Sequence, residues 1–296
     1  MRYWGKIIQG FFSKTKKSPI KINDKSENDK VEADEAKPIQ SNDDEPKNDV
    51  INMEENNNNP IEEQNPWMDL KPLPNNATNV VNVPWAKYYQ TKHTKKQIVL
   101  HHTVSGPGIE GDLNHWKTFT SHIATCVIID RTGIINRLFS SAYWGFHLGA
   151  NNRTLDQQSI AIELDSWGPL IKGNGELYKF SNNKTIRTEI NQMYNLYGSK
   201  VNVDVVHYPQ KFRGYEYYEK YTYEQIRAVG QLLLLWYNTY GIPLTYNEDM
   251  WDVSSRALSG TSGVWSHTSY RRPVDKQDVH PQPELIQMLQ TLDKIK

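Results

Sequence analysis

The apolar residues of this chain are unevenly distributed, and that distribution most limits what the chain can fold into. Hydrophobic residues make up 37% of its 296 residues, and the shortage falls in the first part of the chain. Residues 21–83 are rich in Asn, Asp, Glu, Lys and Pro and include the run Asn56–Pro60. A segment with so little apolar surface cannot offset the entropy lost on folding. We therefore expect a disordered acidic tether over residues 21–83 and one folded domain over residues 84–296.

The first 20 residues differ again, since basic side chains such as Arg2 and Lys6 alternate with aromatic ones such as Trp4 and Phe11. Two readings stay open for residues 1–20: a short helix or adhesive disordered end, or an anchor onto a membrane surface or a partner protein. The apolar run at the start is too short and too interrupted for a secretory signal, and no stretch approaches the length of a membrane span. The 34 basic and 34 acidic residues balance, which gives no indication of a nucleic-acid partner.

Strand and helix patterns begin after residue 84 and alternate along the chain. Short apolar, β-branched runs predict strands at residues 97–103, 124–130, 134–139 and 159–165. The second and third runs flank Arg131–Gly133 and predict a hairpin. Helices are predicted at residues 112–120, at residues 222–240, where Thr222 and Gln225 form a capping box, and from about residue 283. The pattern predicts an α/β domain with a mixed central β-sheet flanked by helices.

The supply of metal-binding side chains is restricted, because the chain has a single cysteine, Cys126, and 9 histidines. Any metal would therefore be held by histidines and carboxylates. The pair His101–His102 lies in a predicted strand, where neighbours point to opposite faces, so only one of the two can serve a given site. Without further context, a histidine satisfied by structural hydrogen bonds is the more ordinary interpretation of either position.

Two further segments carry polar groups in informative places. Glu163 lies within the apolar strand run 159–165, and a carboxylate there is costly unless it is paired or used chemically. A salt-bridged structural glutamate is the alternative. Residues 265–278 form a charged, apolar-poor stretch before the last helix, which suits either an ordinary solvated loop or a loop that supplies ligands.

Five motifs occur in a fixed order: IVLHHT at residues 98–103, CVIIDRTGIINRLF at 126–139, AYWGFHLG at 142–149, SIAIEL at 159–164, and SHTSYRRPVDKQDVHPQPEL at 266–285. This ordered set resembles the type-2 N-acetylmuramoyl-L-alanine amidase family, which also includes peptidoglycan recognition proteins and phage endolysins. The resemblance covers residues 95–292. It implies that a Zn²⁺ ion is the cofactor and that bacterial peptidoglycan is the partner.

Carried over position by position, the resemblance implies a role for each of several residues of this chain. The implied zinc ligands are His101, His267 and Asp278, the catalytic residues are Glu163 and Lys276, and the substrate-lining residues are His147 and Trp144. The spacing between His267 and Asp278 is longer than is typical of the family, so Asp275 and His280 are alternative third ligands. Thr125 stands where some members have a catalytic Tyr, which favours Glu163 as the base. The insertion at residues 168–221 has no counterpart in the family.

The implied activity is zinc-dependent hydrolysis of the amide bond between N-acetylmuramic acid and L-alanine. Zinc lowers the pKa of water from about 15.7 toward ~7, so that hydroxide is available at neutral pH. We expect a phage or prophage lysin that is made in the cytoplasm and acts at the cell wall. The alternatives are a peptidoglycan-binding module without catalysis and a virion-associated structural protein with lytic activity.

Overall fold

The computed structural model describes residues 65–74, 77–83, 87–174, 177–179, 185–187, 189–272 and 276–294. One compact unit comprises Asn65–Lys296. The predicted segment 1–20 and the tether up to residue 64 lie outside the described residues. The compact unit therefore starts earlier than the domain boundary predicted at residue 84.

The reason for the earlier start is that apolar side chains before residue 84 pack into the core. Trp67 is 1% exposed, and Leu73 and Val83 are also buried. The indole N–H of Trp67 donates to Gln287 Oε1 at 3.2 Å, and its ring stacks on Tyr223 with centroids 4.9 Å apart. A few apolar residues within a polar stretch are thus enough to attach it to the folded unit.

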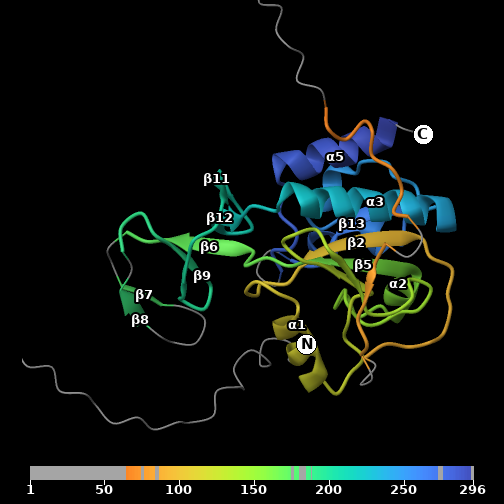
Figure 1. Ribbon diagram of the computed structural model, residues 1–296, viewed down its shortest axis with the longest axis horizontal. Coiled ribbons are helices and arrows are strands. Elements are labelled where there is room, and N and C mark those ends of the chain that lie inside the picture. Colours follow the sequence, from red (N-terminus) through yellow and green to blue (C-terminus); the bar gives the residue numbers. More distant parts are fainter. Residues whose placement is uncertain are drawn as a thin grey trace, which may run out of the picture. The chain divides into compact units, whose positions relative to one another are not determined.

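The main sheet has six strands in the order β1-β4-β3-β5-β2-β13 (Figure 1). Their bounds are β1 Asn79–Val80, β2 Gln97–His102, β3 Val127–Ile129, β4 Ile135–Arg137, β5 Ser159–Leu164 and β13 Gly263–Ser266. The β3–β4 pair is antiparallel, whereas β2 is parallel to both β5 and β13, β3 to β5, and β1 to β4. The predicted mixed sheet is confirmed. Its central strands are buried on both faces, which explains their nearly continuous apolar sequence.

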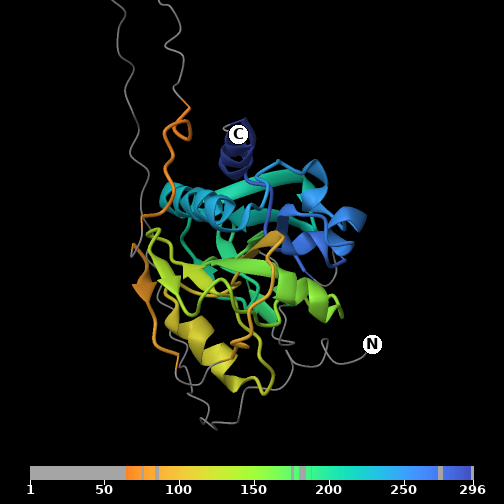
Figure 2. The same cartoon turned by 90° about the vertical axis from the view of Figure 1, so that its right-hand side faces the viewer.

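Helices flank this sheet on both sides, as Figures 1 and 2 show. Helices α3 (Tyr223–Tyr240) and α5 (Pro283–Lys294) lie on one side, and α1 (Glu110–Thr118) lies on the other. The shorter helices are α2 (Arg153–Gln158), η2 (Glu248–Trp251), α4 (Ser255–Leu258) and η3 (His267–Ser269). The capping box predicted at Thr222 and Gln225 is present at the start of α3, and Gly241 ends that helix at φ 67°.

The insertion at residues 168–221 forms a sheet of its own, which the sequence did not predict. Five strands pair in the order β10-β9-β6-β12-β11, and β7 pairs with β8. Their bounds are β6 Pro169–Lys172, β7 Leu177–Lys179, β8 Thr185–Arg187, β9 Met193–Asn195, β10 Lys200–Val201, β11 Val205–Phe212 and β12 Tyr215–Glu219. Most of these strands are short, and β12 is rich in tyrosine, so they lack the apolar runs on which strand prediction depends.

The stretch 265–278 is also more ordered at its start than its composition predicted. Trp265 and Ser266 belong to strand β13, which pairs in parallel with β2, and both residues are fully buried. Pairing with a central strand provides this burial, which a local polar composition does not reveal.

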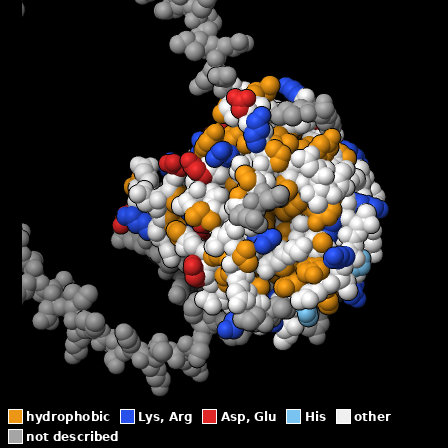
Figure 3. Space-filling model, turned by 45° about the vertical axis from the view of Figure 1, so that its right-hand side comes forward, with side chains coloured by type: hydrophobic (Ala, Val, Ile, Leu, Met, Phe, Trp, Pro, Cys, Tyr) orange, Lys and Arg blue, Asp and Glu red, His pale blue; other side chains and the backbone are white. Residues whose placement is uncertain are grey.

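The surface carries both signs of charge. On the face shown in Figure 3, basic and acidic side chains are scattered among exposed apolar ones, in keeping with the balanced charge of the sequence. Among the described residues, none of the helices combines the length and the apolar character that crossing a membrane requires.

Candidate metal centre

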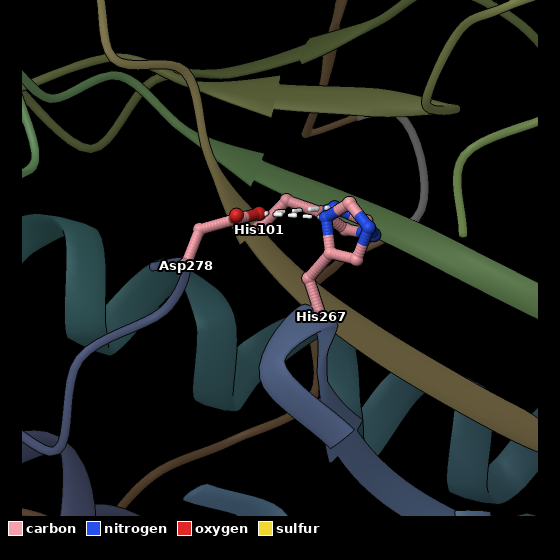
Figure 4. Close-up of side chains that lie close together, drawn as sticks. All are labelled: His101, His267 and Asp278. Carbon is pink, nitrogen blue, oxygen red and sulfur yellow. Dashed lines mark hydrogen bonds and ion pairs between the residues drawn. The ribbon is translucent and has the colours of Figure 1, made fainter. Parts of the chain in front are cut away.

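Three buried side chains from three separate elements meet at one edge of the main sheet (Figure 4). His101 lies at the end of β2, and His267 directly follows β13. Strands β2 and β13 are parallel neighbours, and Ser266 lies opposite Leu100. The next residues, His267 and His101, therefore lie side by side at the carboxyl ends of the two strands. Asp278 comes from the segment before α5 and closes the group.

The distances within the group are those of atoms that share one centre. His101 Nδ1 lies 2.9 Å from His267 Nδ1, and His267 Nδ1 lies 2.9 Å from Asp278 Oδ2. His101 Nδ1 lies 3.4 Å from the same carboxylate oxygen. Each of the three residues is 3% exposed, so the arrangement is shielded from bulk water.

The hydrogen bond on the far side of His267 assigns its protonation. His267 Nε2 lies 2.9 Å from the carbonyl oxygen of Leu148, which can only accept. Nε2 therefore carries the proton, and in the neutral ring Nδ1 is left with a lone pair. That lone pair faces the carboxylate of Asp278.

A longer chain of hydrogen bonds assigns His101 in the same way. Ser159 Oγ donates to the carbonyl oxygen of Leu155 at 2.7 Å, so it accepts from His147 Nε2–H at 2.7 Å. His147 Nδ1 then holds a lone pair and accepts from His101 Nε2–H at 3.0 Å. His101 Nδ1 is consequently also unprotonated.

Three electron-pair donors thus converge with no proton between them, which is the chemistry of a cation site. In tetrahedral coordination with zinc–nitrogen bonds of about 2.0–2.1 Å, neighbouring donors stand about 3.3–3.4 Å apart. The observed separations of 2.9, 2.9 and 3.4 Å are within a few tenths of an ångström of that geometry. Two imidazoles and one carboxylate also match the donor set of catalytic zinc sites, which keep one position open.

Burial keeps the histidines neutral, as metal ligands must be. Burial and the neighbouring His267 lower the pKa of His101 to about 3. Burial likewise lowers the pKa of His267. Burial alone would raise the pKa of Asp278, but its imidazole neighbours and the Lys276 ammonium outweigh burial and hold that pKa well below its usual range.

Glu163 lies next to this group on the same face of the sheet. It is paired in register with His101 across the parallel strands β5 and β2, and such partners project to one face. Burial, followed by the negative charges of Asp278 and Asp112, raises the pKa of Glu163 well above its usual value. The positive charge of Lys276 opposes this shift. A buried carboxyl with a raised pKa beside a cation site has the properties of a proton carrier.

Trp144 and His147, the two residues predicted to line the substrate site, both have partners inside the protein. Trp144 is 2% exposed; its indole N–H donates to Thr91 Oγ1 at 2.8 Å, and its ring stacks on Tyr89. Both ring nitrogens of His147 are engaged inside the protein, with His101 and Ser159. Trp144 is therefore a core side chain, which leaves it little surface for substrate. His147 is half-buried and orients a candidate ligand, and its contact with substrate stays a prediction.

Of the two alternative third ligands, His280 does not join the group. His280 is fully buried, accepts from Tyr208 Oη at 2.8 Å and donates to the carbonyl oxygen of Glu219 at 3.0 Å. Asp275 lies outside the described residues. His102 projects to the opposite face of β2 and bonds Tyr221 Oη at 2.7 Å, as the alternation of side chains along a strand predicts.

Several residues around the centre were not found from the sequence. Asp156 Oδ1 accepts from the backbone N–H groups of His147 and Leu148 at 2.9 and 3.0 Å. Asp156 thereby holds the two residues that orient the candidate ligands: His147 contacts His101, and the carbonyl of Leu148 contacts His267. Ser159 ends the hydrogen-bond chain from His101. Neither residue shows a local signal, because its role depends on contacts formed only in the folded chain.

Comparisons with known proteins find a likeness only among solved structures. No protein-family model and no curated protein matches this chain. Three solved structures illustrate the likeness. The Staphylococcus aureus hydrolase AmiA in complex with its ligand has 12% identity and a TM-score of 0.39 over 76% of this chain and 86% of its own. An AmpD derivative has 12% identity and a TM-score of 0.39 over 72% and 94%. The N-acetylmuramoyl-L-alanine amidase LysC from Clostridium intestinale URNW has 13% identity and a TM-score of 0.33 over 69% and 89%. With identities and TM-scores this low, the likeness by itself assigns no activity to the chain.

Proposed function

We propose that this chain is a zinc-dependent hydrolase that cleaves the amide bond between N-acetylmuramic acid and L-alanine in bacterial peptidoglycan. The observation that carries the proposal is the convergence of the unprotonated His101 Nδ1, His267 Nδ1 and Asp278 Oδ2. The substrate class rests on the ordered motifs, which resemble those of the type-2 amidases. A lysin of phage or prophage origin is the form of such an enzyme that we favour.

The chain would hold the ion through His101, His267 and Asp278. A zinc ion there would polarise the amide carbonyl and make hydroxide available at neutral pH. Glu163 would accept a proton from the attacking water and deliver it to the departing amine of L-alanine, which a raised pKa favours. The ammonium of Lys276, whose charge already acts on Glu163 and Asp278, would stabilise negative charge on the former carbonyl oxygen.

The test uses the purified full chain on isolated peptidoglycan, with and without a chelator. We expect soluble products whose masses correspond to intact glycan and to stem peptides with a free L-alanine amine, together with bound zinc in the protein. Chelation, His267→Ala or Asp278→Ala should abolish release. His115→Ala is the matched control, because His115 lies on the exposed surface of α1.

The result also separates catalysis from binding alone. A protein that binds the wall, carries zinc and releases no peptide would fit the binding module considered above. Release that survives both ligand substitutions would refute the proposed centre.

A further inference from the structure

The tip of the β11–β12 hairpin carries a buried arginine. Arg213 lies in the turn between the two strands at φ 48°, with Gly214 following at φ 90°. A non-glycine residue in the left-handed region is uncommon, and paired positive φ values are typical of tight hairpin turns. Although it is at a turn, Arg213 is only 9% exposed. Its side chain therefore points into the protein rather than into solvent.

The guanidinium of Arg213 binds the segment that joins two of the candidate metal ligands. Its Nη1 donates to the carbonyl oxygens of Arg271 at 2.7 Å and Lys276 at 3.3 Å. Its Nη2 donates to the carbonyl oxygen of Thr268 at 2.8 Å and to Asp252 Oδ1 at 3.0 Å. Thr268 directly follows His267, and Lys276 lies just before Asp278. The side chain of Arg213 thus bonds to the backbone just after His267 and just before Asp278.

The same hairpin also holds the chain beyond Asp278. Tyr208 of β11 donates its hydroxyl proton to His280 Nδ1 at 2.8 Å, because the other ring nitrogen donates to the carbonyl of Glu219 in β12. The insertion therefore contacts the backbone before Asp278, at Lys276, and the side chain of His280 after it. Between these two contacts, the backbone N–H of Thr268 donates a hydrogen bond to the carbonyl oxygen of Asp278 at 2.9 Å.

We propose that Arg213 is a positioning residue for the metal centre and that the β11–β12 hairpin of the insertion braces the backbone next to His267 and Asp278, at Thr268, Arg271 and Lys276. The proposal rests on the proposed function, since it takes the three-residue group to be a zinc site. Arginine suits this task because its planar fork presents five N–H donors at fixed angles and has no acceptor. A lysine could not reach several carbonyls from one position.

The brace has a specific physical consequence. Without it, Asp278 would move relative to the two histidines, which are held by the sheet. Groups outside the ligand set that orient ligands typically change metal affinity by about 10–100-fold when removed. A purely structural arginine would instead lower the thermal stability without changing the affinity or geometry of the bound metal.

The test compares Arg213→Met with Lys211→Met in the full chain. Lys211 lies in the same hairpin, and its ammonium is exposed and 3.5 Å from Glu216 Oε1. The Zn²⁺ dissociation constant is measured by competition with a chelating dye, and the visible spectrum of the Co²⁺-loaded protein reports the coordination. We expect Arg213→Met to weaken Zn²⁺ binding by about 10–100-fold and to alter the Co²⁺ spectrum. Lys211→Met should change neither.

Folding is monitored by circular dichroism for each variant. A folded Arg213→Met protein with unchanged Zn²⁺ affinity and Co²⁺ spectrum would overturn the proposal. If Arg213→Met does not fold, Arg213→Lys and Tyr208→Phe decide the question on the same two readouts, with weakened binding expected and unchanged binding overturning it. A wild-type chain that binds no Zn²⁺ would instead refute the proposed function on which this inference rests.

Discussion

Removing the hydroxyl of Ser159 should weaken metal binding without touching a ligand. Ser159 is 2% exposed, and its Oγ accepts a hydrogen bond from His147 Nε2–H at 2.7 Å. In Ser159→Ala, this buried N–H loses its acceptor. The ring of His147 can avoid this unsatisfied N–H by changing tautomer. Its proton would then lie on Nδ1 and be donated to His101 Nε2. His101 would then carry its own proton on Nδ1, the atom that faces His267 and Asp278.

The size of the effect follows from that exchange of tautomers. Metal binding requires the lone pair of His101 Nδ1, so it forces His147 back to the form whose N–H is unsatisfied. An unsatisfied buried donor costs about 1–3 kcal/mol. At 1.4 kcal/mol for each factor of ten, Zn²⁺ affinity should fall by roughly 5- to 150-fold.

Zn²⁺ affinity is measured by competition with a chelating dye, and imidazole nitrogen shifts in NMR report the tautomers directly. Ser262→Ala is the matched control, because Ser262 is exposed and its hydroxyl donates to the carbonyl of Lys96 at 2.7 Å. The reasoning is refuted if folded Ser159→Ala binds Zn²⁺ as tightly as the wild type. It is equally refuted if wild-type His101 carries its proton on Nδ1.

Three further outcomes are expected. Glu163→Gln should retain bound zinc but lose about 10²–10⁴-fold in peptide release, and full release with zinc bound would exclude Glu163 as the proton carrier. Burial raises the pKa of Asp112 from 3.8 to about 7, so its protonated form is favoured in the fold and its contribution to stability is lost as pH rises from about 4 through 7. Asp112→Asn should therefore raise the unfolding free energy at pH 8 by up to roughly 4 kcal/mol, and a gain that persists unchanged in urea titrations at pH 4 would contradict this. Deleting residues 1–64 should leave the melting temperature unchanged. Deleting residues 1–83 also removes Trp67 and should lower the unfolding free energy by roughly 3–5 kcal/mol. Equal melting temperatures of the two truncated proteins would show that Trp67 does not stabilise the unit.

The parts of the fold that the sequence predicted are those with local causes. Strands β2 and β5 and the capping box at Thr222 depend only on residues that are close together in the sequence. Their patterns can therefore be recognised from the sequence alone. Side-chain alternation also separated His101 from His102 correctly, since that follows from strand geometry alone. By contrast, the grouping of His267 and Asp278 with His101 came only from the resemblance to a family. No local pattern indicates that residues 166 positions apart will meet.

The structure also adds contacts that the sequence does not show. The resemblance to the family implied that Trp144 lines the substrate cleft, whereas in the structure Trp144 is buried and stacks on Tyr89. The two ring nitrogens of His147 complete a hydrogen-bond chain from Ser159 to His101, and its predicted contact with substrate stays a prediction. The role of each polar side chain depended on which partners the fold supplied.

The three candidate ligands differ in how firmly the fold places them. His101 and His267 extend from parallel neighbouring strands, so the register of β2 with β13 sets their separation. Asp278 lies on irregular backbone and has no such register. Its position depends on contacts that come from elsewhere, chiefly from the inserted hairpin that bears Arg213. Substitutions far from the centre should therefore disturb the carboxylate ligand more readily than either imidazole, and the insertion is where such substitutions should be found.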